Sequence, residues 1–294
     1  MPSISIIGVG RVGGALAIAL ARSGYTIDRI VHRGSATAEL ISRKLPSTVV
    51  ISSSNSFPDI DSDIVLITTA DPDIEQAAHQ LESHVPGRPV VLHTSGSLSS
   101  EVVSNLKAVG CPTGSMHPLI SISDAVAGSE SFADAYFCIE GDEAAQVVAK
   151  SIVAALGGRA FSIRSEDKPL YHAAAVMASG HTVALFDAAI EMLSECGIDA
   201  KTAQATLLPL IKSTIINLET QAPPRALTGT FARADVGAFE RHLTAIDKSI
   251  SVAIRDIYLL LGERSLALAE ANGADPERLE NLRKSISIAK RKSE

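Results

Sequence analysis

The sequence predicts a doubly wound α/β sheet domain over residues 1–164, followed by an all-α helical domain over residues 165–294. Three observations lead to this prediction. Short apolar runs alternate with helical patterns in the first half, which is typical of a parallel sheet with helices on both faces. A glycine-rich turn follows the first apolar run. After Ser165 the strand signals end, and long helical periodicity continues to the end of the chain.

The elements of the first domain follow in order along the chain. The expected strands are SISIIG, TIDRIV, TVVIS, DIVLITT, PVVLHT and YFCIE, and GGRAFSI at residues 157–163 is expected to be the last. Helical patterns such as RVGGALAIALARSG and DEAAQVVAKSIVAALGG separate most of them. Short strands with intervening helices are the pattern of repeated βαβ units.

The second domain is expected to be entirely helical. Its predicted helices cover residues 169–196, 202–219, 236–245, 250–271 and 276–290. The segment QAPPRALTGTFARAD is rich in Pro and Gly, so a loop is expected there. The apolar stretch at residues 173–190 contains His181 and Asp187, which favours a buried core helix over a membrane span.

Composition excludes several classes of protein. A net charge of -7 argues against a nucleic-acid surface, because phosphate binding relies on clustered Lys and Arg. Cys111, Cys138 and Cys196 lie far apart without a CxxC pair, so neither a disulfide framework nor a metal site is predicted. No basic, cleavable leader precedes the first strand, and a cytoplasmic location is expected.

A glycine fingerprint follows the first strand. Gly8, Gly10 and Gly13 have G-x-G-x-x-G spacing, with Arg11 and Val12 inside the motif. Such a turn lets the backbone approach a pyrophosphate at the start of a helix. The alternative is a tight turn that binds no ligand. The position between strand and helix favours a dinucleotide site.

The end of the second strand indicates which nucleotide is bound. An NAD site expects a carboxylate roughly 20 residues beyond the glycines, to bind the ribose 2′-hydroxyl. This chain instead has His32, Arg33 and Ser35 there, and Asp28 lies too early in the strand. A guanidinium can pair with a 2′-phosphate, so NADP (NADPH) is the predicted cofactor. Alternatively, Arg33 is a solvated loop arginine.

Polar residues follow three further strands at the edge where open sheets bind ligands. Thr69 and Ala70 are expected along the ribose and nicotinamide, with Asp71 capping the next helix. His93, Thr94 and Ser95 follow the fifth strand. His117, in GSMHPL, follows the sixth. We expect His93 and His117 at the reacting end, although a histidine at a strand end often satisfies only backbone groups.

The first helix after the sheet carries three polar residues in an apolar setting. At 100° per residue, Lys168, His172 and Ser179 lie within about 40° of one another. A reduced carbonyl or imine needs a proton, and a buried lysine or a histidine can supply one near neutral pH. We therefore predict catalytic roles for Lys168 and His172 and substrate binding by Ser179. The alternative is a snorkelling lysine and a core histidine.

Two residues of the helical domain complete the predicted site. Arg233 precedes a helix that Asp235 is expected to cap, and it could hold a substrate carboxylate. A solvated loop arginine is the equally open alternative. Asn217 is the other candidate for substrate binding.

Five motifs together resemble a bacterial family of two-domain Rossmann-like proteins whose helical part is a domain of unknown function. They are SIIGVGRVGGALAIAL, LHTSGSLSSEVV, GSMHPL, KPLYHAAAVMASG and ALTGTFARADV. The resemblance covers essentially the full chain. It extends to pyrroline-5-carboxylate reductase, deazaflavin-dependent NADP oxidoreductase, ketopantoate reductase and the 6-phosphogluconate dehydrogenase C-terminal-like group. It also implies a homodimer.

The resemblance implies roles for particular residues. In ketopantoate reductase and the 6-phosphogluconate dehydrogenase group, the first helix after the sheet carries a catalytic lysine, which Lys168 matches. His172 stands where those proteins have a substrate-binding asparagine. Gly180 replaces an asparagine beside Ser179. His117 in HPL is similar to the histidine of HPM in prephenate dehydrogenases.

The leading interpretation is an NADP(H)-dependent oxidoreductase that transfers a hydride between the nicotinamide and a small oxo- or imino-acid, with a ketopantoate-type substrate as one option. Two alternatives are an NADP-binding sensor without turnover and a prephenate-dehydrogenase-like enzyme. The expected partners are a small-molecule substrate and a second copy of the chain, without nucleic acid or membrane. The substrate, the reaction direction and a deazaflavin partner are left open.

Overall fold

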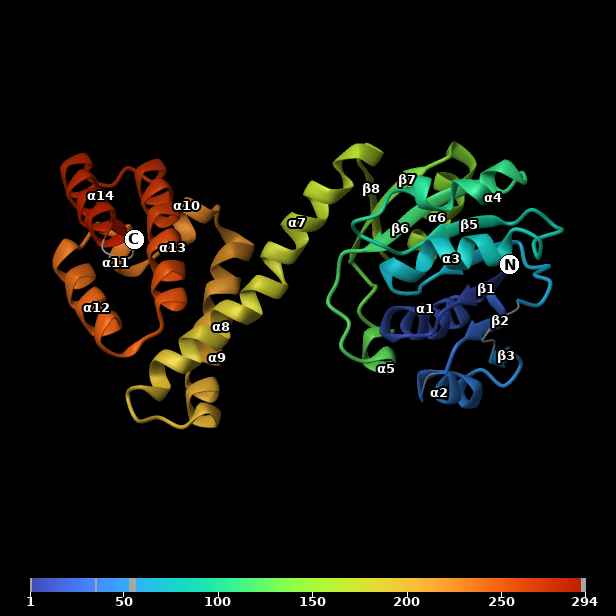
Figure 1. Cartoon of the computed structure of the whole chain (residues 1–294), viewed down its shortest axis with the longest axis horizontal. Coiled ribbons are helices and arrows are strands. Elements are labelled where there is room, and N and C mark those ends of the chain that lie inside the picture. Colours follow the sequence, from blue (N-terminus) through green and yellow to red (C-terminus); the bar gives the residue numbers. More distant parts are fainter. Residues whose placement is uncertain (1, 35, 53–56, 292–294) are drawn as a thin grey trace. The chain divides into compact units, whose positions relative to one another are not determined.

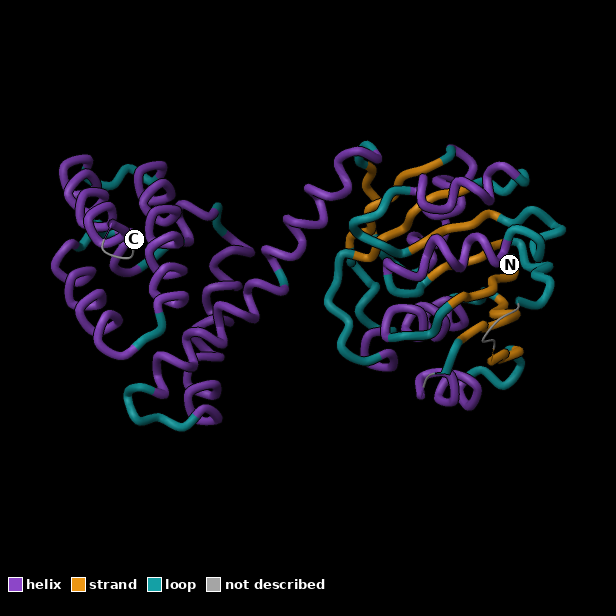
Figure 2. Tube along the Cα trace, in the orientation of Figure 1, coloured by secondary structure: helices purple, strands orange, loops and turns teal. Residues whose placement is uncertain are grey.

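The computed structural model describes residues 2–34, 36–52 and 57–291. The chain forms two compact units, residues 1–180 and residues 181–294. The first contains the sheet and is called the sheet unit. The second consists of helices and connecting loops and is called the helical unit (Figure 2). The predicted fold class, an α/β sheet domain followed by an all-α domain, is confirmed.

One eight-stranded sheet, in the order β3-β2-β1-β4-β5-β6-β7-β8, forms the centre of the sheet unit (Figure 1). The strands are β1 Ser3–Ile7, β2 Thr26–His32, β3 Val49–Ser52, β4 Ile64–Ile67, β5 Val90–His93, β6 Thr113–Pro118, β7 Tyr136–Gly141 and β8 Arg159–Ser162. The strand order reverses direction between β1 and β4. In an open α/β sheet, such a switch point is where the ligand crevice forms.

The sheet is parallel only from β3 to β6. β7 pairs antiparallel to β6, and β8 runs parallel to β7. The expectation of an all-parallel sheet is therefore wrong at this edge. A parallel neighbour requires a long crossover that returns the chain to the same end of the sheet. Between β6 and β7 the chain has only the four-residue helix α5, Ala125–Gly128, so β7 runs back beside β6.

Helices cover both faces of the sheet because successive strand residues point to opposite sides. Along β1, Ile6 belongs to the core formed with α1 and α6, and Ile7 belongs to the core formed with α3 and α4. The helices of this unit are α1 Arg11–Arg22, α2 Ala36–Lys44, α3 Asp71–Leu81, η1 Ser100–Val103, α4 Ser104–Ala108, α5, α6 Glu143–Ala155, η2 Ser165–Asp167 and α7 Lys168–Ala178.

The helical unit has its own core. Phe239, Leu259, Leu282 and Ile286 are fully or almost fully buried there. Its helices are α8 Gly180–Ser194, α9 Ala200–Thr220, α10 Pro223–Ala226, α11 Gly229–Ala232, α12 Val236–Ser249, α13 Val252–Ala271 and α14 Pro276–Arg291. The segment predicted as a loop contains two single-turn helices, α10 and α11. The prolines of α10 are well suited to a first helical turn.

The predicted helix at 169–196 is two helices. α7 ends at Ala178 and α8 begins at Gly180, with Ser179 at φ -116° and ψ -76° between them. The prediction that this stretch is a buried core helix is wrong. Lys168 is the only buried residue of α7, and Ala188 the only one of α8, among the described residues. Periodicity reveals that a helix has an apolar face, but not what covers it.

The same stretch has the length and composition of a membrane span. Within residues 165–194, an 18-residue window has a mean hydropathy of 1.4, and 6% of that window is buried within the chain. It is the one such stretch in the part of the chain that the structure describes. Exposed apolar side chains continue on α9 and α13, as at Leu210 and Leu260.

The sheet unit extends to residue 180, whereas strand signals in the sequence end near residue 164. The boundary of the compact unit lies after the last strand signal because α7, although helical, packs against the sheet. The buried side chain of Lys168, at the start of α7, reaches the loop after β5 and Ser115 within β6. All four predicted catalytic residues therefore lie in one compact unit.

Candidate functional site

The glycine fingerprint forms the turn between β1 and α1. Gly8 has φ +86°, a conformation that favours glycine. A Cβ on Gly13 would lie 2.2 Å from Oγ1 of Thr68 and 2.5 Å from the carbonyl oxygen of Gly8, so this position packs helix against strand. Gly10 has open space where its Cβ would stand, and no side chain caps α1 there. The first turn of α1, with Arg11 and Val12, is therefore open to an anion.

A small pocket lies beside this turn, on the side where the adenosine part of a dinucleotide is expected. Gly8, His32, Arg33 and Thr69 line it, together with residues of α3. Oγ1 of Thr69 is buried and has no hydrogen-bond partner among the described residues. A buried hydroxyl without a partner is costly, and a bound ligand would satisfy it. The residues present therefore fit the predicted nucleotide.

The guanidinium of Arg33 forms a short ion pair with the carboxylate of Asp73, in the first turn of α3. His32 accepts a hydrogen bond on Nδ1 from the backbone N–H of Gly34 at 2.9 Å. Ser35, also predicted to bind the nucleotide, lies outside the described residues. The carboxylate that the sequence lacks at the end of β2 is thus supplied from α3, and it faces the arginine predicted to hold a 2′-phosphate.

The start of α3 differs from the prediction. Asp71 is not the cap, because the N-cap position is Ala70 and Asp71 is the first helical residue. The carboxylate of Asp71 instead accepts a hydrogen bond from Oγ of Ser97 at 2.6 Å. This bond links the loop after β4, where Thr69 and Ala70 lie, to the loop after β5. The two loops therefore form one continuous edge.

His93 holds the loop that follows β5. It is 0% exposed. Its Nδ1 accepts from the backbone N–H of Ser95, and its Nε2 lies 3.2 Å from the carbonyl oxygen of Ser99. Burial, followed by the nearby Lys168 ammonium, lowers the pKa of His93 to about 4. Both nitrogens are engaged by the loop, which positions Thr94 and Ser95; a catalytic role for His93 itself stays a prediction.

Lys168 is also 0% exposed. Its Nζ donates to the carbonyl oxygen of Ser95 at 2.8 Å and, through a short contact, to Oγ of Ser115. Burial lowers the pKa of Lys168, and the charge of Glu140 opposes this shift. Glu140 itself accepts from the backbone and hydroxyl of Ser100 and from Ser165. The ammonium thus joins α7 to the loop after β5 and to β6, without a direct carboxylate partner among the described residues.

His117, Tyr171 and His172 meet beside this lysine. Nδ1 of His117 lies 2.7 Å from the hydroxyl of Tyr171. The rings of His117 and His172 meet edge to face, with centroids 5.9 Å apart. A Cβ on Gly96 would lie 2.8 Å from Nε2 of His117 and 2.5 Å from Cδ2 of His172. Glycine is therefore required where the loop after β5 passes between the two histidines.

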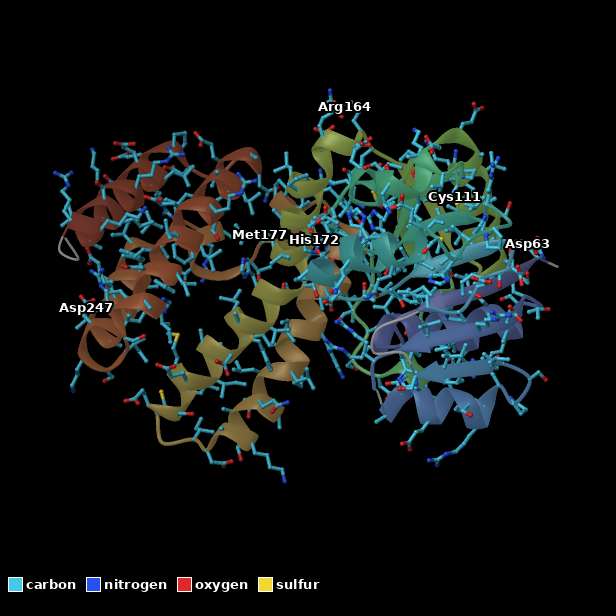
Figure 3. The ribbon with its side chains drawn as sticks, turned by 45° about the vertical axis from the view of Figure 1, so that its right-hand side comes forward. Asp63, Cys111, Arg164, His172, Met177 and Asp247 are labelled. Carbon is cyan, nitrogen blue, oxygen red and sulfur yellow. The ribbon has the colours of Figure 1, made fainter. Side chains whose placement is uncertain are left out.

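A pocket of about 670 Å³ opens next to these rings. His117, Tyr171, His172 and Ser179 line it, with apolar residues of α7 and the loop after β6. Figure 3 labels His172 and Met177, which both come from α7. Of the predicted α7 stripe, His172 and Ser179 face this pocket, whereas Lys168 points into the sheet unit.

The two predicted substrate residues of the helical unit lie in different places. Arg233 follows α11 and lines a shallow pocket with Asp235 and Arg278. Asn217 is half-buried on α9. Asp235 caps α12 by accepting from the backbone N–H of Ala238 at 2.9 Å, as predicted. Substrate binding by Arg233 and Asn217 stays a prediction.

Sequence reasoning missed several members of the polar cluster. Tyr171 stands directly before His172 in the sequence. It follows Lys168 by three residues, so the two side chains lie on the same side of a helix. That spacing could have singled it out. Ser115 and Glu140 are ordinary strand residues in the sequence, and only the pairing of β5, β6 and β7 brings them to Lys168 and its loop. No local sequence signal predicts that Ser115 and Glu140 belong to this cluster.

Two family models match the chain. Residues 2–118 match a Rossmann-like domain, and residues 135–265 match the domain of unknown function DUF2520. A search of the curated proteins finds no match.

Solved structures show the same fold. BF3122 from Bacteroides fragilis, assigned by name as an NADP oxidoreductase, is 21% identical with a TM-score of 0.73, over 90% of this chain and 98% of its own. Protein TM1727 from Thermotoga maritima is 24% identical with a TM-score of 0.70, over 92% and 99%. A Plasmodium falciparum pyrroline carboxylate reductase with NADP bound is 13% identical with a TM-score of 0.57, over 91% and 98%. The chain thus combines a Rossmann-like domain with a DUF2520 domain.

Proposed function

We propose that this protein is an NADP(H)-dependent oxidoreductase acting on a small oxo- or imino-acid. The observation that carries the proposal is the glycine turn at the β1–β4 switch point, beside a pocket that Thr69 helps to line and near the buried Thr69 hydroxyl, which has no partner among the described residues. Bound there, the cofactor would supply or accept the hydride. Its nicotinamide end would extend along the loops after β4 and β5, towards His117 and His172.

Several solved structures with this fold support the proposal by their names. The Plasmodium falciparum pyrroline carboxylate reductase contains NADP, and BF3122 is assigned as an NADP oxidoreductase. Arg33 is the residue of this chain that would pair with a 2′-phosphate, after exchange of Asp73 for the phosphate. The ketopantoate-type substrate remains one option within the proposed class of oxo-acids.

The residues around α7 would handle the substrate. Lys168 is the candidate proton donor, because burial lowers the pKa of its ammonium and so eases proton release. His117 and His172 line the pocket and would contact the substrate's oxygen or nitrogen atoms. Ser179, Arg233 and Asn217 are the proposed substrate-binding residues.

Calorimetric titration tests the proposal. Purified protein is titrated with NADPH and then with NADH, before and after addition of oxo- and imino-acids such as ketopantoate. We expect tighter binding of NADPH, and substrate-dependent NADPH oxidation with at least one acid of the panel. Absence of binding by either nucleotide would mean that the glycine loop is only a turn.

A nucleotide sensor without turnover is the second candidate. One observation favours it: Lys168 and His93 have no exposed surface, and each is hydrogen-bonded within the protein. Tight nucleotide binding without oxidation of NADPH by any acid would support this candidate. A prephenate-dehydrogenase-like enzyme is a third, since His117 lies in an HPL motif at the end of β6; NAD(P)-dependent turnover of a cyclohexadienyl acid would support it.

We also propose that a second copy covers exposed apolar side chains of the helical unit, and that the homodimer is cytoplasmic. The side chains include Leu210, Ile216 and Leu260, each at least half exposed. Light scattering should give a dimer mass, and Leu210→Glu together with Ile216→Glu should give monomers. Sedimentation of the unaltered protein with membranes after cell lysis would favour a bilayer as the cover, in line with the apolar stretch at 165–194.

A further inference from the structure

The hydroxyl of Tyr171 is aimed at one nitrogen of His117. The two groups come from different elements, α7 and β6, and the oxygen lies 2.7 Å from Nδ1. The rings meet edge to face with centroids 5.6 Å apart. On its other side Tyr171 packs against Phe161, again edge to face, at 5.9 Å. The phenol is therefore held between two rings, and its orientation is determined by packing.

This contact engages one of the two nitrogens of His117 that can carry the proton. A neutral imidazole has one donor and one acceptor nitrogen. Burial, then the charges of Lys168 and His172, lower the pKa of His117 to about 4, and Asp71 acts in the opposite direction. Burial raises the pKa of Tyr171. At neutral pH the imidazole is therefore neutral and the phenol keeps its proton.

The Tyr171 hydroxyl can either donate its proton to Nδ1 or accept a proton from it. Among the described residues, Nδ1 of His117 is the one recorded hydrogen-bond partner of the Tyr171 hydroxyl. If Tyr171 donates to Nδ1, the imidazole proton lies on Nε2. The Cε1–Nε2 edge of the ring lies next to Gly96, since a Cβ there would be 2.8 Å from each of these atoms. Gly96 belongs to the loop after β5, at the edge where the ligand is proposed to bind.

We propose that Tyr171 is a positioning residue that holds His117 in the tautomer with its proton on Nε2. His117 then presents a neutral hydrogen-bond donor to the substrate, which would stabilise negative charge that develops on oxygen or nitrogen as the hydride arrives. The catalytic meaning of this tautomer rests on the proposed oxidoreductase function. The tautomer itself does not.

The test is ¹⁵N NMR of histidine-labelled protein at neutral pH, because protonated and unprotonated ring nitrogens give distinct shifts. The chain has eight histidines, so His117→Gln identifies the His117 signals. We expect Nε2 protonated and Nδ1 unprotonated in the unaltered protein. Tyr171→Phe should convert His117 to a mixture of tautomers.

Tyr136→Phe is the matched control. Tyr136 also meets Phe161 edge to face, at 6.3 Å, but it lies on β7 and is about half exposed. Its loss should leave the His117 signals unchanged. A proton on Nδ1 in the unaltered protein would overturn the proposal, and this measurement needs no variant. Unchanged signals in a folded Tyr171→Phe protein would overturn it as well.

Kinetics give a second readout once a substrate is known. Tyr171→Phe should lower kcat by about tenfold or more, a part of the roughly 10²–10⁴-fold that a positioned acid or base contributes, with KM little changed. A change in KM alone would contradict the positioning role. Nucleotide titration separates the two proposals. If the protein binds neither NADPH nor NADH, the proposed oxidoreductase function is wrong and the proposed tautomer still stands. If the proton of His117 lies on Nδ1, the tautomer proposal is wrong and the evidence for nucleotide binding still stands.

Discussion

The two ends of the candidate site are built in different ways. At the nucleotide end, three glycines within six residues shape one turn, and the groups offered to a ligand are mainly backbone N–H groups. At the α7 end, Lys168 reaches Ser95, 73 residues away, and Ser115, 53 residues away, and the cluster consists of buried and half-buried side chains. One end depends on local backbone geometry and the other on the packing of distant elements. Four predictions test this difference.

The largest expected effect is a fall in the free energy of unfolding at acid pH, caused by protonation of His93 at the α7 end of the site. The folded-state pKa of His93, about 4, lies below the ordinary value of 6.5, so the unfolded chain binds this proton more tightly. The contribution of neutral His93 to the free energy of unfolding is fully present above pH 6.5. It is lost as the pH falls towards 4, and the loss is on the order of 3 kcal/mol. Denaturant titrations from pH 7 to pH 4 measure the free energy of unfolding.

His93→Gln provides the comparison, because glutamine keeps a donor and an acceptor but does not titrate. The variant should lose a clear part of the pH dependence of the unaltered protein. His117, whose pKa is also lowered to about 4, would contribute to the remainder, as would carboxylates with lowered pKa such as Asp142. Identical slopes in the two proteins would contradict the assignment of His93 as a buried neutral group.

The next effect is at the nucleotide end. In Gly13→Ala the new Cβ would meet backbone and side-chain atoms within 2.5 Å, so the sheet unit should lose about 1–3 kcal/mol and cease to bind nucleotide. Gly10→Ala is the matched control: its Cβ meets open space, so stability should change by less than about 0.5 kcal/mol. Its nucleotide affinity should still fall, because the methyl group occupies the approach of the pyrophosphate. Equal stability of the two variants would argue against the packing role of Gly13.

Lys168→Met tests the bridge between α7 and the strand ends. The carbonyl of Ser95 loses its donor, which costs about 1–3 kcal/mol, but methionine no longer requires a charge to be buried. We expect a net loss smaller than that of Gly13→Ala, together with loss of turnover. Lys150→Met, on the exposed surface of α6, should change neither. Full turnover of Lys168→Met would exclude Lys168 as the proton donor.

The smallest effect on stability is expected at Arg33. Arg33→Ala breaks an exposed ion pair, worth about 0–1 kcal/mol, but it should lower the affinity for NADPH roughly tenfold or more relative to NADH. Asp73→Asn removes the competing carboxylate and should raise the NADPH preference by at most about fivefold. Calorimetry measures both ratios. An unchanged ratio in Arg33→Ala would remove the basis for NADP over NAD.

Much of the fold could be predicted, because its signals are local. The strand β6 was missed, because GSMHPL is not an apolar run and was expected to follow a strand, whereas it forms most of β6. The order of the other strands and helices follows from apolar runs of limited length, and Asp235 could be recognised as a cap from the residues beside it. The direction of β7 could not, because it depends on how the chain returns from β6. The break at Ser179 was also missed, since helical periodicity continues on both sides of it.

By itself, the sequence determined the two-domain architecture, the glycine turn and the set of polar residues that reach the sheet edge. Only the tertiary structure decided how those residues divide their roles. It buries Lys168 and His93 within the sheet unit, pairs His117 with Tyr171, and sets Asp73 against Arg33. The physical reason is that backbone preferences act between neighbours in the chain, whereas burial, pKa and hydrogen-bond partners depend on elements that only the fold brings together.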